Sequence, residues 1–150
     1  MTRAQARAKI RRLQKQGKVV GFTNGCFDLL HLGHLHTLTL ARETCDVLFV
    51  GLNSDDYLRR TKGPDRPVHN EETRCGVLSA LECVDGVIVF NEETATELVQ
   101  ALHPDVIARY IEGMDRWPEG RLVQSYGGRA VILDKLGDYS TTNTVRKIKS

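Results

Sequence analysis

The sequence predicts an α/β fold: a single Rossmann-like, doubly wound domain with a five-stranded parallel sheet and helices on both faces. Apolar runs of strand length alternate with segments of helical period along the chain, which is typical of parallel strands joined by right-handed helical crossovers. A length of 150 residues suits one domain, and 41% hydrophobic with 27% charged residues is usual for a globular protein. We therefore expect residues 1–150 to form one domain.

The N-terminal segment 1–18 has seven basic side chains and no acidic one, within a chain whose net charge is only +2. Ala6, Ile10 and Leu13 recur at helical spacing, and a glycine follows them. This pattern favours a basic surface helix over residues 1–17, packed by one narrow apolar stripe. A transit peptide or a nucleic-acid-binding arm is the alternative for such a segment.

Five short apolar runs are predicted to be the strands of the sheet. Each is followed by a turn or by a segment of helical period. None approaches the roughly 18 apolar residues of a membrane helix, so we expect no membrane span. The predicted strands are Val19–Thr23, Asp46–Leu52, Val87–Phe90, Asp105–Tyr110 and Ala130–Leu133.

Helix starts are predicted from capping residues. Asn70 is placed to cap a helix whose first turn holds two glutamates, which suit the positive end of the helix dipole. Thr94 and Glu97 form a capping box for the next helix, and Pro104 ends it. The apolar faces of the predicted helices are Leu35, Leu38 and Ala41; Val77, Leu78, Leu81 and Val84; and Leu98, Val99 and Leu102, with a last helix over Thr141–Ile148.

The four cysteines are predicted to be free thiols. Cys26, Cys45, Cys75 and Cys83 have no close paired spacing, and no secretory apolar segment precedes them. The sequence therefore indicates neither a zinc site nor a disulfide framework. The expected compartment is the reducing cytoplasm.

The turn after the first strand holds the candidate site, since parallel sheets bind ligands outside the carboxyl ends of their strands. Gly25 permits a tight turn there, and His31 and His34 are three residues apart on one face at the start of a helix. Because a helix N-terminus offers unpaired N–H groups and partial positive charge, this assembly suits a phosphate. The alternative is that one histidine caps the helix and the other lies in the core. The occurrence of two histidines with Gly33 between them, directly after the first strand, disfavours this alternative.

The run Gly25–His34, GCFDLLHLGH, resembles the HxGH signature of the nucleotidyltransferase superfamily of cytidylyltransferases and adenylyltransferases. Four further motifs, in order, are similar to those of one branch, the D-glycero-D-manno-heptose-1-phosphate adenylyltransferases that make ADP-heptose. The likeness extends from about Lys18 to Ile148. The motifs are GLNSD at 51–55, KGPDRPV at 62–68, ALECVD at 80–85 and YSTT at 139–142.

This resemblance implies that a phosphate oxygen of an acceptor attacks the α-phosphorus of a nucleoside triphosphate and that pyrophosphate leaves. A phosphate monoester, with a second pKa of about 6, is already largely dianionic near neutral pH, so no general base is required. Positioning and charge stabilisation remain as the main tasks. Mg²⁺ is implied, bound mainly through triphosphate oxygens and water, because the sequence shows no carboxylate cluster to hold it. A homodimer is implied as well.

The same resemblance assigns roles to individual residues. His31, His34 and Lys62 are the expected catalytic residues: the imidazoles donate to the triphosphate, and the lysine approaches the phosphates from a Gly/Pro-rich loop. For Arg74, a surface ion pair with an acid one turn earlier is the alternative to a phosphate contact. The expected nucleotide-binding residues are Asn24, Gly25, Cys26, Phe27, Asn53, Arg74, Ser140, Thr141 and Thr142, and the expected acceptor-binding residues are Asp28, Arg66 and Glu112.

Departures from the family pattern bear on the substrate. Heptose enzymes of this type have Lys-Gly-Gly-Asp after the fourth strand, whereas this chain reads Glu112-Gly113-Met114-Asp115 slightly later, so that a carboxylate replaces a cation. The family's glycine before the Tyr-Ser-Thr-Thr motif is missing as well. Lys135 lies close to the place where cytidylyltransferases have an arginine.

Three functional hypotheses follow. The motif set favours an adenylyltransferase that transfers AMP from ATP to a sugar 1-phosphate. A cytidylyltransferase for a small phospho-alcohol such as glycerol 3-phosphate shares the HxGH signature and a similar last helix. The third hypothesis, from another class, is a non-catalytic nucleotide- or nucleic-acid-binding module that uses the basic N-terminal helix. A nucleic-acid partner is the least favoured.

Overall fold

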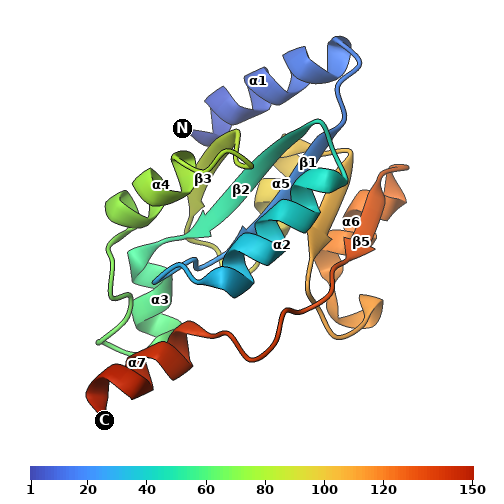
Figure 1. Ribbon diagram of the computed structural model, residues 1–150. Coiled ribbons are helices and arrows are strands. Elements are labelled where there is room, and N and C mark those ends of the chain that lie inside the picture. The colour runs from blue at the N-terminus through green and yellow to red at the C-terminus, as the bar shows by residue number, and fades with distance from the viewer.

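A five-stranded parallel sheet runs through the computed structural model, which describes residues 1–150, and helices cover both of its faces (Figure 1). The strand order is β3-β2-β1-β4-β5, so the predicted fold class is confirmed. The strands are β1 (Val20–Gly25), β2 (Val47–Asn53), β3 (Gly86–Phe90), β4 (Val106–Arg109) and β5 (Arg129–Ile132). The helices are α1 (Arg3–Lys15), α2 (Leu32–Glu43), α3 (Asp55–Lys62), α4 (Glu71–Ser79), α5 (Thr96–Leu102), α6 (Pro118–Ser125) and α7 (Thr141–Lys149), with a 3-10 turn, η1 (Met114–Arg116).

Strand β1 lies at the centre of the sheet, between β2 and β4. Its parallel register with β2 runs from Val20 opposite Val47 to Gly25 opposite Leu52. The chain builds outward from β1 through β2 to β3, then crosses back to form β4 and β5 on the other side. This reversal opens a crevice at the carboxyl ends of β1 and β4, where sheets of this kind bind ligands.

Two hydrophobic clusters hold the helices on the sheet. Helices α1, α5 and α6 pack on one face, and α2 and α4 pack on the other. Along β2, Phe49 belongs to the first cluster, whereas its neighbours Leu48 and Val50 belong to the second. This division follows from the strand geometry, in which successive side chains point to opposite faces.

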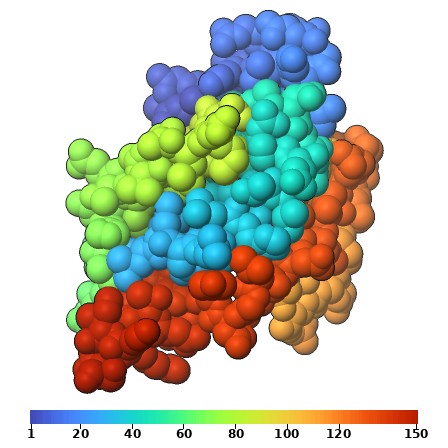
Figure 2. Space-filling model, in the orientation of Figure 1, coloured from blue at the N-terminus to red at the C-terminus, as the bar shows by residue number.

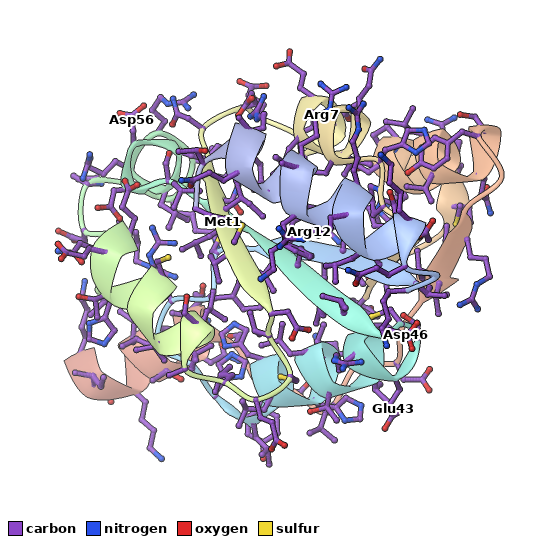
Figure 3. The ribbon with its side chains drawn as sticks, turned by 90° about the horizontal axis from the view of Figure 1, so that it is seen from above. Met1, Arg7, Arg12, Glu43, Asp46 and Asp56 are labelled. Carbon is purple, nitrogen blue, oxygen red and sulfur yellow. The ribbon has the colours of Figure 1, made fainter.

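The basic helix α1 is packed as the sequence predicts. Thr2 and Gln5 form a capping box at its start, and Ala6 and Ile10 are fully buried. Figure 3 shows α1 crossing over the strands, and the amino group of Met1 donates to a carbonyl oxygen of β3 at 3.1 Å. The helix is therefore an integral part of the fold.

Two helices, α3 and α6, are absent from the sequence prediction. The first is capped by Ser54, whose Oγ accepts a hydrogen bond from the Tyr57 N–H at 3.1 Å, and the second begins with Pro118. Each has only eight residues, and so short a segment shows little periodicity. Lys62, which is predicted to lie in a loop, is therefore the last residue of α3, directly before the loop.

The predicted capping box of Thr94 and Glu97 is wrong. Helix α5 begins at Thr96, and no side chain caps it. The hydroxyl of Thr94 instead donates to the hydroxyl of Thr96 at 3.0 Å, and the N–H of Ala95 donates to Glu119 Oε1 at 2.9 Å. A carboxylate from α6 thus binds the backbone just before α5, where a local capping box is predicted.

Helix α4 begins where it is predicted to begin, because Asn70 Oδ1 accepts a hydrogen bond from the Thr73 N–H at 2.9 Å. It ends at Ser79, earlier than predicted, so Leu81 and Val84 pack on the sheet from the following turns. No helix of the structure combines the length and the hydrophobicity that crossing a bilayer requires.

Candidate active site

A cavity of about 680 Å³ opens at the carboxyl edge of the sheet, where β1 and β4 meet. The ends of β1, β2 and β4 and the starts of α2 and α7 contribute to its wall. Figure 2 shows the C-terminal segment, in orange and red, lying directly against α2, in light blue. Segments far apart in the chain therefore enclose one site.

His31 and His34 cap the first turn of α2 for each other. The His34 N–H donates to His31 Nδ1 at 3.4 Å, and the His31 N–H donates to His34 Nδ1 at 3.2 Å. The two rings stack with their centroids 3.8 Å apart. Because each Nδ1 accepts a hydrogen bond, a neutral ring carries its proton on Nε2. The pair therefore keeps two Nε2–H donors, and both residues line the cavity.

Burial keeps this pair neutral at pH 7. The pKa of His34 is lowered to about 4, mainly by burial and to a smaller extent by the charges of His31 and Lys62. The carboxylate of Asp28 acts in the opposite direction, but its effect is weaker. Burial also lowers the pKa of His31. Both histidines thus cap the helix and both face the cavity, so the alternative of one capping and one core histidine does not describe this structure.

Gly33 lets the C-terminal segment approach the histidine pair. A Cβ at this position would lie 2.8 Å from Tyr139 Cβ and 3.0 Å from the His31 ring. The ring of Tyr139 stacks on His31 with centroids 5.8 Å apart. A larger residue would therefore separate the segment before α7 from the HxGH signature.

The N-terminus of α7 forms another part of the cavity wall. Ser140 caps the helix by accepting a hydrogen bond from the Asn143 N–H at 2.9 Å, and the hydroxyl of Thr141 donates to the Asp28 carbonyl oxygen. Ser140, Thr141 and Thr142 all line the cavity. Capping and facing the site are therefore compatible roles for this motif.

The structure brings together the residues predicted to be catalytic and all but one of the residues predicted to bind the nucleotide. The hydrogen bond from Cys26 Sγ to Asn53 Oδ1, at 3.6 Å, joins the ends of β1 and β2 beneath the cavity. Arg66, which is predicted at the acceptor, also lines the wall. The assembled set is His31, His34, Lys62, Asn24, Gly25, Cys26, Phe27, Asn53, Ser140, Thr141 and Thr142.

Arg74 is the exception, and neither role expected for it fits its position. Its guanidinium is almost fully buried and donates to the carbonyl oxygens of Cys26 at 2.7 Å and Asn53 at 2.8 Å. It also donates to the His69 carbonyl oxygen at 3.0 Å and pairs with Asp55 at 2.8 Å. Arg74 therefore lies outside the cavity wall and forms no surface ion pair with an acid one turn earlier; it joins the ends of β1 and β2 to the loop before α4.

Asp28 is likewise part of the scaffold. Its carboxylate, which is 1% exposed, accepts hydrogen bonds from the N–H groups of Val68 at 2.6 Å and His69 at 3.0 Å. Arg66 Nε lies 3.7 Å from the same carboxylate. Asp28 is absent from the cavity wall, which differs from the position expected for an acceptor-binding residue. It holds the loop that follows Lys62 against the turn after β1.

Glu112 lies outside the cavity wall, contrary to expectation. Its side chain is 75% exposed, and its Oε2 is 4.0 Å from Arg116 Nη1. Arg116, in contrast, lines the cavity. The irregular chain between β4 and η1 turns the Glu112 carboxylate toward solvent, and Arg116 lies at the rim of the cavity.

Two residues on the α5 and α6 side of the cavity, Arg109 and Glu119, are not among the predicted site residues. Arg109 Nε is buried without a hydrogen-bond partner. The position of Arg109 at the carboxyl end of a strand is a signal that identifies it. Glu119 carries no such signal, because α6 itself is not predicted.

The structure contains no cluster of three or more His, Cys, Asp or Glu side chains arranged to hold a metal ion. Besides the carboxylates of Glu93 and Glu119, the cavity wall presents imidazole, hydroxyl, lysine and arginine groups. These groups suit anionic oxygens, so a divalent cation at this site would need the ligand's own oxygens and water as its ligands.

The chain matches one protein family over most of its length. Residues 22–142 match the family model described as Cytidylyltransferase-like. The bifunctional protein HldE of Syntrophotalea carbinolica is 48% identical over 139 residues, which cover 90% of this chain and 28% of that protein. HldE of Acidiphilium cryptum is 44% identical over 154 residues, covering 100% of this chain and 31% of that protein. The chain thus spans less than a third of the length of these relatives.

Two solved structures share the architecture. A lipopolysaccharide core biosynthesis protein from Thermoplasma volcanium superimposes with a TM-score of 0.68 at 28% identity, covering 80% of this chain and 99% of that one. Pantoate-beta-alanine ligase from Francisella tularensis, in complex with beta-gamma ATP and beta-alanine, gives a TM-score of 0.66 at 14% identity, covering 96% of this chain and 71% of that one. The second likeness shows the fold alone.

Proposed function

Because the chain belongs to the cytidylyltransferase-like family, we propose that it transfers AMP from ATP to a sugar 1-phosphate, with release of pyrophosphate. The product would be a nucleotide-activated sugar such as ADP-heptose. The observation that carries this proposal is the neutral histidine pair, which shares one cavity with the N-terminus of α7 and with Lys62. The motif resemblance to heptose-1-phosphate adenylyltransferases and the match to HldE support the choice of substrates.

The histidine pair is suited to charge that develops during the reaction. As the bond between the α-phosphorus and the bridging oxygen lengthens, negative charge accumulates on the leaving pyrophosphate. The Nε2–H groups of His31 and His34 donate to these oxygens, and such bonds strengthen as the charge grows. Since the two histidines cap α2 and their rings stack on each other, they are held in place and little reorganisation accompanies the step.

The leaving group is held at the start of α7. Backbone N–H groups at a helix N-terminus bind phosphate oxygens, and the hydroxyls of Ser140, Thr141 and Thr142 add further donors. Lys62, at the end of α3, supplies a cation beside them. The acceptor phosphate is already an anion near neutral pH, so these residues need only position the reactants and stabilise charge.

The proposed reaction also involves a metal ion, a domain, a compartment and an oligomeric state. Mg²⁺ would accompany the triphosphate, coordinated by its oxygens and by water, because the residues present form no cage for a metal. Residues 1–150 would act as the nucleotidyltransferase domain. The four free cysteines are consistent with a cytoplasmic location. A homodimer stays a prediction.

A pyrophosphate-release screen tests the proposal. Each of ATP, CTP, GTP and UTP is combined with heptose 1-phosphate, other sugar 1-phosphates and glycerol 3-phosphate. We expect the highest kcat/KM with ATP and a sugar 1-phosphate. Turnover of CTP with glycerol 3-phosphate would favour the cytidylyltransferase hypothesis. The absence of turnover, together with steeply salt-dependent binding to DNA or RNA that is lost on removal of residues 1–16, would favour the binding module.

A further inference from the structure

The cavity has a second end, away from the histidines, between the start of α6 and the loop that leads from β3 into α5. We call this part the α5–α6 end; it is formed by Thr94, Ala95, Pro118 and Glu119, with Arg109 next to it at the end of β4. The reaction residues described above come from α2, α3 and α7. None of these residues comes from the α5–α6 end, so the proposed reaction does not say which ligand binds there.

Glu119 is the distinctive group at this end. It is only 5% exposed, and its Oε1 accepts one hydrogen bond, from the Ala95 N–H at 2.9 Å. No lysine or arginine forms an ion pair with it. Because a carboxylate offers about four acceptor positions, most of its capacity is unused within the protein. Glu93, the other carboxylate on the wall, is exposed.

Unpartnered polar atoms point to a polar ligand in the same region. Asn24 Oδ1 and Arg109 Nε, which lie on the sheet face that α5 and α6 cover, are buried without hydrogen-bond partners, and both residues line the cavity. They lie at the carboxyl ends of the adjacent strands β1 and β4. Buried polar groups without partners destabilise a fold unless a ligand or water satisfies them, so these atoms indicate a bound polar molecule.

The geometry of the reaction decides which substrate occupies this end. In a displacement at phosphorus, the attacking and leaving oxygens are roughly in line on opposite sides of the phosphorus atom. Pyrophosphate leaves toward α2 and α7, so the attacking phosphate approaches from the other side, nearer the ends of β1 and β4. The acceptor then extends toward α5 and α6. A carboxylate repels phosphate, and therefore Glu119 has to meet an uncharged part of the acceptor.

We propose that Glu119 determines acceptor specificity by accepting hydrogen bonds from the hydroxyl groups of a polyhydroxylated acceptor whose phosphate lies beside Arg109. This inference rests on the proposed function and deepens it. Hydroxyls donate to a buried carboxylate, and such charge-assisted bonds are stronger than neutral ones. An acceptor with few hydroxyls, such as glycerol 3-phosphate, would leave the carboxylate largely unpaired and would be disfavoured for that reason.

The substitution Glu119→Gln tests this role with little disturbance of the fold, because the amide oxygen can still accept from the Ala95 N–H. We expect kcat/KM for heptose 1-phosphate to fall by about 10- to 100-fold, as for the loss of a hydrogen bond to a charged group. The KM for ATP should change by less than about twofold, since the nucleotide does not reach this carboxylate. Glu97→Gln is the matched control, because Glu97 is an exposed glutamate of α5 outside the cavity wall, and it should leave both values within about twofold.

Acceptor binding provides a readout that does not depend on turnover. Calorimetric titration of heptose 1-phosphate into the protein with a non-hydrolysable ATP analogue should show weaker binding for Glu119→Gln by a similar factor. Glycerol 3-phosphate should bind the variant at least as well as the wild type, because an unpaired amide costs less than an unpaired carboxylate.

An unchanged acceptor affinity in Glu119→Gln, or a change confined to the KM for ATP, overturns the role of Glu119 even if the wild type is active. Tight acceptor binding that depends on Glu119, without pyrophosphate release from any triphosphate, contradicts the proposed function while supporting this inference.

Discussion

Helices α1 and α2 begin with the same hydrogen-bonding pattern, a reciprocal capping box, built from different side chains. At α1, the Gln5 N–H donates to Thr2 Oγ1 at 3.1 Å, and the Thr2 N–H donates to Gln5 Oε1 at 2.8 Å. At α2, the two Nδ1 atoms of His31 and His34 accept at 3.4 Å and 3.2 Å. The α1 box is exposed, whereas the α2 box lines the cavity.

The difference shows how one structural role can be combined with a chemical one. Threonine and glutamine cap at shorter distances and complete the helix start. The imidazoles cap at longer distances, but each keeps a ring N–H that a ligand can use. The α2 box therefore gives up part of its capping strength and supplies two donors beside the proposed phosphate site. Equivalent changes at the two boxes should therefore have different consequences.

The largest expected effect is on turnover at the α2 box. Replacing His31 or His34 by Ala should lower kcat by about 10² to 10³, the usual loss for one donor to a developing oxyanion. Steady-state pyrophosphate release measures the change, and circular dichroism checks that the helix content is retained. Turnover close to the wild-type value in both variants would remove the histidines from the mechanism.

Acidification should reveal the second difference, because only the α2 box contains a titratable cap. The pKa of His34 is about 4 in the folded protein, below its ordinary value of 6.5, so the unfolded chain binds a proton that the folded chain excludes. The contribution of His34 to stability is therefore complete above pH 6.5 and declines as the pH falls through 6.5 toward 4.

Two measurements check this pH dependence. The imidazole resonances of His34 in a two-dimensional NMR titration should show a midpoint near pH 4. As the pH is lowered from 6.5 toward 4, the unfolding free energy from urea titrations should fall less steeply in His34→Gln than in the wild type. A midpoint near the ordinary value of 6.5 would contradict the buried, neutral pair.

A moderate effect, confined to stability, is expected at the α1 box. Thr2→Ala removes the capping hydroxyl and should lower the unfolding free energy by about 1 kcal/mol, as is typical for such caps. The kcat should be unchanged, because α1 contributes no residue to the cavity wall. Urea denaturation and pyrophosphate release on the same preparation separate the two readouts. A fall in kcat comparable to that of the histidine variants would mean that the two boxes do not differ in function.

The smallest effect is expected at Glu112, which the sequence places at the acceptor and the structure places in solvent. Glu112→Lys should leave the ratios of kcat/KM among acceptors unchanged, within about twofold, since an exposed charge is strongly screened. The acceptor panel used for the proposed function provides the comparison. A selective gain with sugar 1-phosphates would show that this loop closes over the acceptor after all.

Local sequence patterns identified those features that short-range interactions decide. The five strands, the basic helix, the Asn70 cap and the histidine pair after β1 all depend on residues close together in the chain. The start of α7 at the Ser140 motif belongs to the same group. Sequence therefore identified most of the residues that line the cavity, because they lie in short loops that directly follow strands or precede helices.

The tertiary structure decided the features that depend on contacts across the sheet. Arg74 and Asp28 could be assigned to ligands from sequence, yet their partners, 48 residues away at Cys26 and 41 residues away at His69, bury them in the scaffold. Glu119 gains its place only because α6 folds back to meet Ala95. A charged side chain takes its role from the groups that surround it, and a single sequence does not reveal neighbours that only folding brings into contact.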